Sequence, residues 1–164
     1  MEEVKTRIKI ALIKCDFSNP EHITAVKILI NEYIIDPMGG GSLHNKKKQD
    51  QLIEGLKYHP TVFLFLAYYE NEYAGLILSF ENFSTFMVRK MINIHDIIVK
   101  EKFRNKGIGK ALLYGVIEEA KKRNCGKITL EVRKDNSIAQ SIYREADFSI
   151  SHPPMLFLTK YIEG

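Results

Sequence analysis

One short stretch, residues 104–111, constrains the fold of this chain more than any other. Its sequence, Arg-Asn-Lys-Gly-Ile-Gly-Lys-Ala, stands between a β-branched apolar run at 92–99 and an amphipathic helical pattern at 108–120. A helix that starts directly after a strand has first-turn N–H groups without intrahelical acceptors. Gly107 and Gly109 let this backbone approach a bound group closely. The stretch therefore predicts an anion site at the helix start, and phosphate is the natural ligand.

Positive charge surrounds the same stretch. The basic residues are Lys100, Lys102, Arg104, Lys106 and Lys110. We expect their field to favour an anionic ligand. The formal net charge of the 164-residue chain is +4, which suits an anionic cofactor. No aromatic-rich basic patch or groove-reading motif accompanies this charge, so we expect no nucleic acid partner.

Two familiar phosphate loops do not fit these residues. A Walker A loop requires glycine at the position of Arg104 and Ser or Thr at the position of Ala111. A dinucleotide-binding fingerprint requires a third glycine at the position of Leu112, and its strand should open the domain. Both nucleotide-binding interpretations are therefore excluded.

The pattern Arg-x-x-Gly-x-Gly that begins at Arg104 instead resembles the pyrophosphate loop of the GNAT superfamily of acetyl-CoA-dependent N-acetyltransferases. A second motif, residues 136–143, is similar to the family's Asn-x-x-Ala-x-x-x-Tyr pattern. The chain departs from the family at Asn105 and at Asp147, where glycine is usual. Asn and Asp tolerate a positive φ better than other non-glycine residues, so we expect the backbone geometry to be kept.

The order of the predicted elements is also similar to that of the family. We expect a single α+β domain over residues 1–164, with a mostly antiparallel central sheet of about six to seven strands flanked by about four helices. The predicted elements are, in order, a strand at 7–14, a helix from Pro20, a helix ending at Tyr58, strands at 62–69, 72–81 and 92–99, a helix from Ile108, a strand at 127–133, a helix at 137–145 and a strand at 155–161.

The resemblance implies acetyl-CoA as the cosubstrate. In the family, the strand before the loop splays from its neighbour and pairs with the pantetheine arm, and a backbone N–H near Ile98 would polarise the thioester carbonyl. Asn136 corresponds to a polar cofactor contact of the family, and it is equally a helix cap. The cofactor-binding residues implied are Ile97, Ile98, Val99, Arg104, Asn105, Lys106, Gly107, Ile108, Gly109, Lys110, Asn136 and Tyr143.

Three residues are candidates for proton transfer. Tyr143 is implied to be the general acid, because a phenol can protonate the leaving CoA thiolate. His95 is the candidate base for the amine, directly or through water, and Asp96 would orient the amine or attract its cation. Strand alternation places His95 on the side of Ile97 and Asp96 on the other side unless a bulge intervenes. Glu131 is a weaker third candidate, and an interior histidine that only orients its neighbours is the alternative for His95.

The expected function is direct transfer of the acetyl group of acetyl-CoA to a primary amine of a small molecule. A protein or peptide acetyltransferase is the first alternative, and a noncatalytic acyl-CoA sensor is the second; Tyr143 and the pair His95-Asp96 argue against the sensor. The histidines lack metal-ligand spacing, so we expect no metal. No basic leader or long apolar run is present, so we expect a cytoplasmic protein without a membrane partner. The sequence allows a homodimer.

Overall fold

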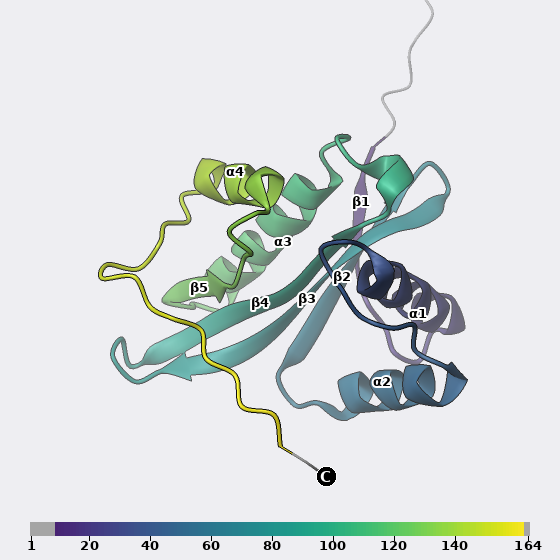
Figure 1. Ribbon diagram of the computed structural model, residues 1–164, viewed down its shortest axis with the longest axis horizontal. Helices are drawn as coiled ribbons and strands as arrows, with labels where there is room; N and C mark the ends of the chain where they lie inside the picture. Colours follow the sequence, from purple (N-terminus) through teal and green to yellow (C-terminus); the bar gives the residue numbers. More distant parts are fainter. Residues whose placement is uncertain (1–8, 163–164) are drawn as a thin grey trace, which may run out of the picture. The chain divides into compact units, whose positions relative to one another are not determined.

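The computed structural model describes residues 9–162, which form two compact units, one up to Glu131 and one from Val132. The first unit contains one sheet with the strand order β1-β2-β3-β4-β5 (Figure 1). Its strands are β1 (Ala11–Lys14), β2 (Val62–Tyr69), β3 (Glu72–Ser84), β4 (Arg89–Val99) and β5 (Lys127–Leu130). Its helices are α1 (Pro20–Ile35), α2 (Lys46–Tyr58), the short 3-10 helix η1 (Glu101–Phe103) and α3 (Ile108–Lys122).

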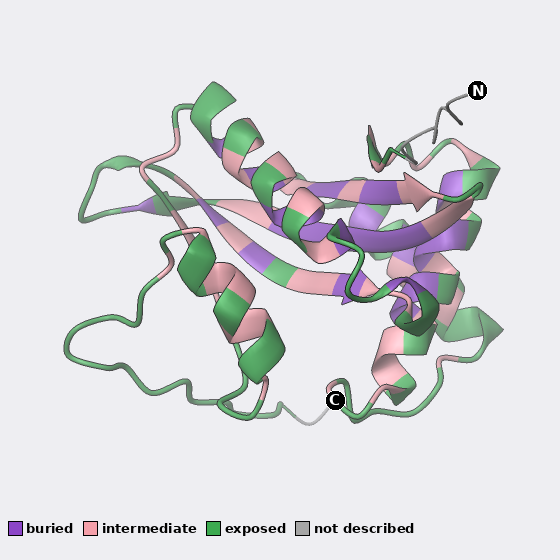
Figure 2. Cartoon of the chain, turned by 90° about the horizontal axis from the view of Figure 1, so that it is seen from above, coloured by how far each residue is buried: buried purple, intermediate pink, exposed green. Residues whose placement is uncertain are grey.

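The sheet is mixed because of a single crossover. Strands β1 to β4 pair antiparallel, and β5, which follows α3, pairs parallel with β4. Helices α1 and α2 pack on one face of the sheet and α3 packs on the other (Figure 1). Buried residues gather between the sheet and these helices (Figure 2). The core under α1 and α2 includes Val26, Leu29, Leu64, Leu66, Leu76, Leu78 and Ile98.

The predicted sheet of six to seven strands is larger than the sheet of the structure, which has five strands in the described residues. Strand β5 ends at Leu130 and not at Arg133, and residues 155–161 form no strand. Strand β1 begins at Ala11, and the start of the predicted strand at 7–14 lies outside the described residues. A run of strand-forming residues needs a neighbour to pair with, and composition does not supply one.

One extra residue interrupts the pairing of β4 with β3. Asp96 lies opposite Leu78, whereas Ile94 lies opposite Ser79, so His95 is a bulge residue without a partner on β3. A bulge of this kind shifts the alternation of side chains by one position along the strand. Ile94 and Ile97 therefore share one face of the sheet.

The second unit carries the helix α4 (Ser137–Glu145). Asn136 caps this helix, since its Oδ1 accepts a hydrogen bond from the Ala139 N–H at 3.1 Å. Asp147, just past its end, has a φ of 64°, and Asn105 in the first unit has a φ of 60°. The prediction that these two residues replace glycine in left-handed backbone is confirmed.

Within residues 9–162, no helix is long and apolar enough to cross a membrane. Cys15 and Cys125 are both free thiols. Burial raises the pKa of the Cys15 thiol to about 12. This thiol therefore stays protonated at neutral pH and is a poor nucleophile.

Candidate acetyl-CoA and amine site

Among residues 9–162, no strand pairs past the bulge with the edge of β4 that faces away from β3. On that edge, strand β5 pairs with β4 only from Met91 to Ile94. The Lys100 N–H donates to the Ala74 carbonyl at 2.9 Å, which makes this an antiparallel hydrogen-bonded pair. Along two antiparallel strands, hydrogen-bonded pairs alternate with pairs whose backbone groups point away from the partner strand. Ile98 therefore bonds to β3, and the backbone groups of Ile97 and Val99 point to the open edge. An extended ligand arm would thus pair with Ile97 and Val99, and the N–H of Ile98, named in the sequence prediction, is already bonded to β3.

The start of α3 presents backbone N–H groups at the same end of β4. Among the described residues, no acceptor bonds the N–H groups of Asn105, Lys106, Gly107, Ile108 or Gly109. Gly107 has a φ of 83° and provides no side-chain cap, whereas asparagine side chains cap α1, α2 and α4. Asn105 and Gly107 both have left-handed backbone, a conformation that occurs in the anion-binding turns formed by successive N–H groups.

Gly109 provides open space beside these N–H groups. A Cβ added there would meet only Val99 Cγ2, at an ordinary contact distance of 3.7 Å. Packing within the protein therefore does not require glycine at this position. A pyrophosphate close to the backbone would require it.

The basic residues around the loop are largely paired with acids. Lys100 and Lys102 both contact the carboxylate of Glu72, the former at 3.4 Å, and Lys106 lies 3.4 Å from Glu70. The two lysines lower the pKa of Glu72, mainly through the hydrogen bond from Lys102. The positive field predicted from the sequence is therefore weaker than the count of lysines suggests, and the N–H groups carry more of the anion-binding geometry.

Arg104, one of the predicted cofactor-binding residues, has no free backbone N–H to offer an anion. That N–H donates to the Glu101 carbonyl at 3.1 Å and is already used. The guanidinium donates from Nε to the Val99 carbonyl at 3.3 Å and from Nη2 to Asp36 Oδ2 at 2.5 Å. Arg104 therefore fixes the end of β4 and the end of α1.

The bulge places His95 and Asp96 on the same face of the sheet, which corrects the simple alternation. Asp96 shares the face of Leu78 under α1 and α2, and the His95 ring packs on Phe80, 5.6 Å between centroids, on that face. His95 is exposed, whereas Asp96 is partly buried. Burial raises the pKa of the Asp96 carboxyl, and the nearby His95 opposes this shift.

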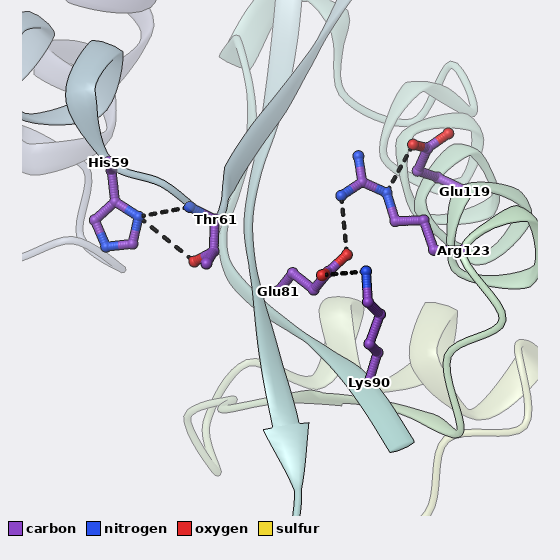
Figure 3. Close-up of polar contacts among 6 residues, drawn as sticks. All are labelled: His59, Thr61, Glu81, Lys90, Glu119 and Arg123. Atoms are coloured by element: carbon purple, nitrogen blue, oxygen red, sulfur yellow. Dashed lines mark hydrogen bonds and ion pairs between the residues drawn. The ribbon is translucent and has the colours of Figure 1, made fainter.

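His59 also contacts the Phe80 ring. Its ring centroid is 4.7 Å from that of Phe80, and its Nδ1 accepts the Thr61 N–H at 3.3 Å. Figure 3 shows His59 and Thr61 on one side of the strands and the ion-pair cluster of Glu81 on the other. The sequence reasoning missed Phe80, because nothing in an apolar strand marks the one ring that contacts the bulge histidine.

The remaining predicted residues lie elsewhere in the chain. Glu131 directly follows β5 and is exposed. Tyr143 lies on α4 in the second unit, where its ring packs against Phe148 at 6.0 Å and its carbonyl accepts the Phe148 N–H at 2.9 Å. Asn136 is on the same unit as the cap of α4. In residues 9–162, no three His, Cys, Asp or Glu side chains group as metal ligands.

A model of the acetyltransferase (GNAT) family matches residues 27–148, which include the open edge of β4, the loop and α4. The chain belongs to the GNAT family. L-ornithine N5-acetyltransferase NATA1 of Arabidopsis thaliana is 35% identical to it over 72 residues, or 44% of this chain. That segment spans 32% of the length of the Arabidopsis enzyme.

Solved structures of GNAT-like proteins share the fold. A probable acetyltransferase superposes with a TM-score of 0.78 at 18% identity, over 95% of this chain and 99% of its own. Aminoglycoside N-acetyltransferase AAC(6')-Iy in complex with CoA gives 0.75 at 14% identity, over 97% and 99%. Ribosomal-protein-alanine N-acetyltransferase from Brucella melitensis biovar Abortus 2308 gives 0.70 at 16% identity, over 94% and 99%. At these identities the likeness establishes the fold.

The open space at Gly109 makes it a test of cofactor binding. Gly109→Trp should abolish acetyl-CoA binding in isothermal titration while the thermal midpoint stays near the wild-type value, because the indole would fill the space beside the N–H groups. Gly55→Trp is the control, since Gly55 lies at an exposed position of α2 with nothing within 4 Å of an added Cβ. Undiminished affinity in a folded Gly109→Trp variant would remove the pyrophosphate assignment.

The raised pKa of Asp96 predicts a pH-dependent cost in stability. The folded state holds this proton more tightly than the unfolded state, whose value is near 3.8, so wild-type stability falls as the pH rises above that value. Asp96→Asn should therefore raise the thermal midpoint at neutral pH and lose this advantage in acid. Asp50→Asn, which removes an exposed carboxylate beside Lys27, should give no such gain. A wild type more stable than Asp96→Asn at neutral pH would contradict the burial of this charge.

Proposed function

We propose that this protein transfers the acetyl group of acetyl-CoA directly to a primary amine of a small molecule. One observation carries the proposal: an open strand edge and the free N–H groups at the start of α3 lie together at one end of β4. The likeness to an ornithine acetyltransferase over 72 residues supports a small amine as acceptor.

The residues at this end of β4 fit acetyl-CoA, which would supply a thioester as the acetyl donor. Backbone N–H groups from Asn105 to Lys110 would bind its pyrophosphate. The open edge at Ile97 and Val99 would hold the pantetheine arm as an added strand, the way extended peptides add to sheet edges. An N–H of this edge would stabilise the charge that develops on the thioester oxygen.

The acceptor amine must lose a proton before it attacks. An alkylamine has a pKa of about 10.4, so nearly all of it is protonated at neutral pH. His95, exposed on the α1 and α2 face, would take this proton directly or through water. Asp96, on the same face, would attract the cation. Phe80 would hold the His95 ring in place through its edge contact.

Tyr143 would complete the reaction. When the amine nitrogen bonds to the acetyl carbon, the carbon–sulfur bond breaks and the thiolate leaves with its electron pair. A thiol has a pKa of about 8.5 and a phenol about 10, so the Tyr143 hydroxyl can donate a proton or a hydrogen bond to the departing sulfur. The motif at 136–143 supports this assignment.

A protein or peptide acetyltransferase is the second candidate. The fold is shared with a ribosomal-protein-alanine N-acetyltransferase, and this observation favours it. A noncatalytic acyl-CoA sensor is a third candidate, which His95, Asp96 and Tyr143 argue against. A CoA-release assay over an amine library, with and without peptide pools, separates the three. Release with small amines alone supports the proposal, release only with peptides favours the second candidate, and acetyl-CoA binding without release favours the sensor.

His95 should dominate the pH dependence of turnover. His95→Ala should lower kcat by about 10²-fold or more and remove the acidic limb of the pH–rate profile, because the base that must be deprotonated is gone. His59→Ala is the matched control, because it removes another imidazole that contacts Phe80 and should leave that limb in place. If the limb persists in His95→Ala, another group is the base.

Tyr143 should act on the chemical step and not on binding. Tyr143→Phe should lower kcat by about 10²-fold with little change in acetyl-CoA affinity, because only the proton donor is removed. Tyr58→Phe, at an exposed position of α2, should have no effect. A kcat for Tyr143→Phe equal to that of the wild type across about pH 6 to 9 would show that Tyr143 is a packing residue.

A further inference from the structure

We propose that Asp36 is a positioning residue that couples acetyl-CoA binding to the order of the loop between α1 and α2. This inference rests on the proposed function. The loop, residues 36–45, follows α1 on the face that carries His95 and Asp96. The predicted cofactor loop begins α3 on the opposite face. The side chain of Arg104 joins the two around the end of β4.

Asp36 fixes the start of the α1–α2 loop through several bonds of its own. Its Oδ1 accepts the Met38 N–H at 2.9 Å, and its carbonyl accepts the N–H groups of Gly39 at 2.8 Å and Gly40 at 3.0 Å. Its other carboxylate oxygen, Oδ2, bonds to Arg104 at 2.5 Å. The Asp36 carboxylate therefore connects this loop to Arg104, the residue that precedes the free N–H groups at the start of α3.

The Asp36–Arg104 pair is more than an ordinary surface contact. The Asp36 side chain is only 15% exposed, and the Arg104 guanidinium is held at a second point by the Val99 carbonyl. Two anchors give a planar guanidinium a fixed direction, which a single surface ion pair does not. Movement of the loop relative to the end of β4 would break at least one of these bonds.

The direction of the coupling follows from this geometry. A pyrophosphate bound by the N–H groups after Arg104 would restrict the backbone that carries this side chain. The restricted guanidinium would hold Asp36, and with it residues 36–45, in one position. The loop would then be ordered on the amine face when acetyl-CoA is bound, so that the two binding events favour each other.

Hydrogen exchange of residues 36–45, with CoA as the probe, tests this inference. In the wild type, saturating CoA should slow exchange of the loop amides by about 5-fold or more. Asp36→Asn keeps an oxygen for the Met38 N–H but loses the ion pair, so it should bind CoA with near wild-type affinity and lose the loop protection. Asp36→Glu, which restores the carboxylate, should recover part of it. Asp50→Asn, which breaks the 2.5 Å ion pair between α2 and Lys27 of α1, should retain the full effect.

The outcomes distinguish this inference from the proposed function. CoA-dependent protection that persists in Asp36→Asn, or loop exchange that becomes faster when CoA binds the wild type, overturns the coupling and leaves the proposed function intact. A wild type that does not bind CoA overturns both. Should Asp36→Asn fail to fold, Arg104→Lys tests the same bond, because an ammonium cannot span Val99 and Asp36 as the guanidinium does.

Discussion

The bulge at His95 determines how the rest of the candidate site is arranged. One unpaired residue in β4 shifts the alternation of the strand, so that His95 and Asp96 face α1 and α2 together. The same shift directs the backbone of Ile97 and Val99 to the edge that β5 no longer covers. If the bulge were absent and the pairing before it were kept, Asp96 would lie on the α3 face. Ile98, and not Ile97 and Val99, would then present its backbone at the open edge.

The two faces of the sheet therefore have different roles in the proposed reaction. The α3 face and the strand edge provide backbone groups for an anionic, extended ligand. The α1 and α2 face provides ionisable side chains for an amine. Burial raises the pKa of Asp96, which disfavours an isolated charge on this face and favours a carboxylate that has a cation beside it. Arg104 is the side chain that connects the two faces, through Val99 and Asp36.

Local patterns predicted much of this fold. The hairpin from Val62, the start of α3 after Gly107 and the helix from Ser137 to Glu145 follow from turn residues, caps and periodicity, and the structure places them where these signals lie. The strand predicted at 155–161 was wrong, because its apolar alternation depends on a partner strand. The position of His95 could not be predicted, since a bulge is set by the register of two strands far apart in the chain.

The ion-pair partners of the charged residues also could not be predicted from the sequence. The sequence suggests that Arg104 binds phosphate, but in the structure its guanidinium bonds to Asp36 and Val99. The sequence also suggests that the lysines create a positive field, but in the structure Glu70 and Glu72 lie beside them. Such pairs join residues distant in the chain and leave no periodic signal. By contrast, the left-handed backbone at Asn105 is a local property, and it was predicted correctly.

The central claim is that backbone N–H groups at the start of α3 bind the pyrophosphate of acetyl-CoA. Its most direct test is isothermal titration of the unmodified protein with acetyl-CoA and with S-acetylpantetheine, which has the same thioester and arm but no pyrophosphate. Hydrogen bonds to a charged group contribute about 1.5–3 kcal/mol each, so two or more predict an affinity at least about 10²-fold higher for acetyl-CoA. Equal affinities for the two ligands would contradict the claim.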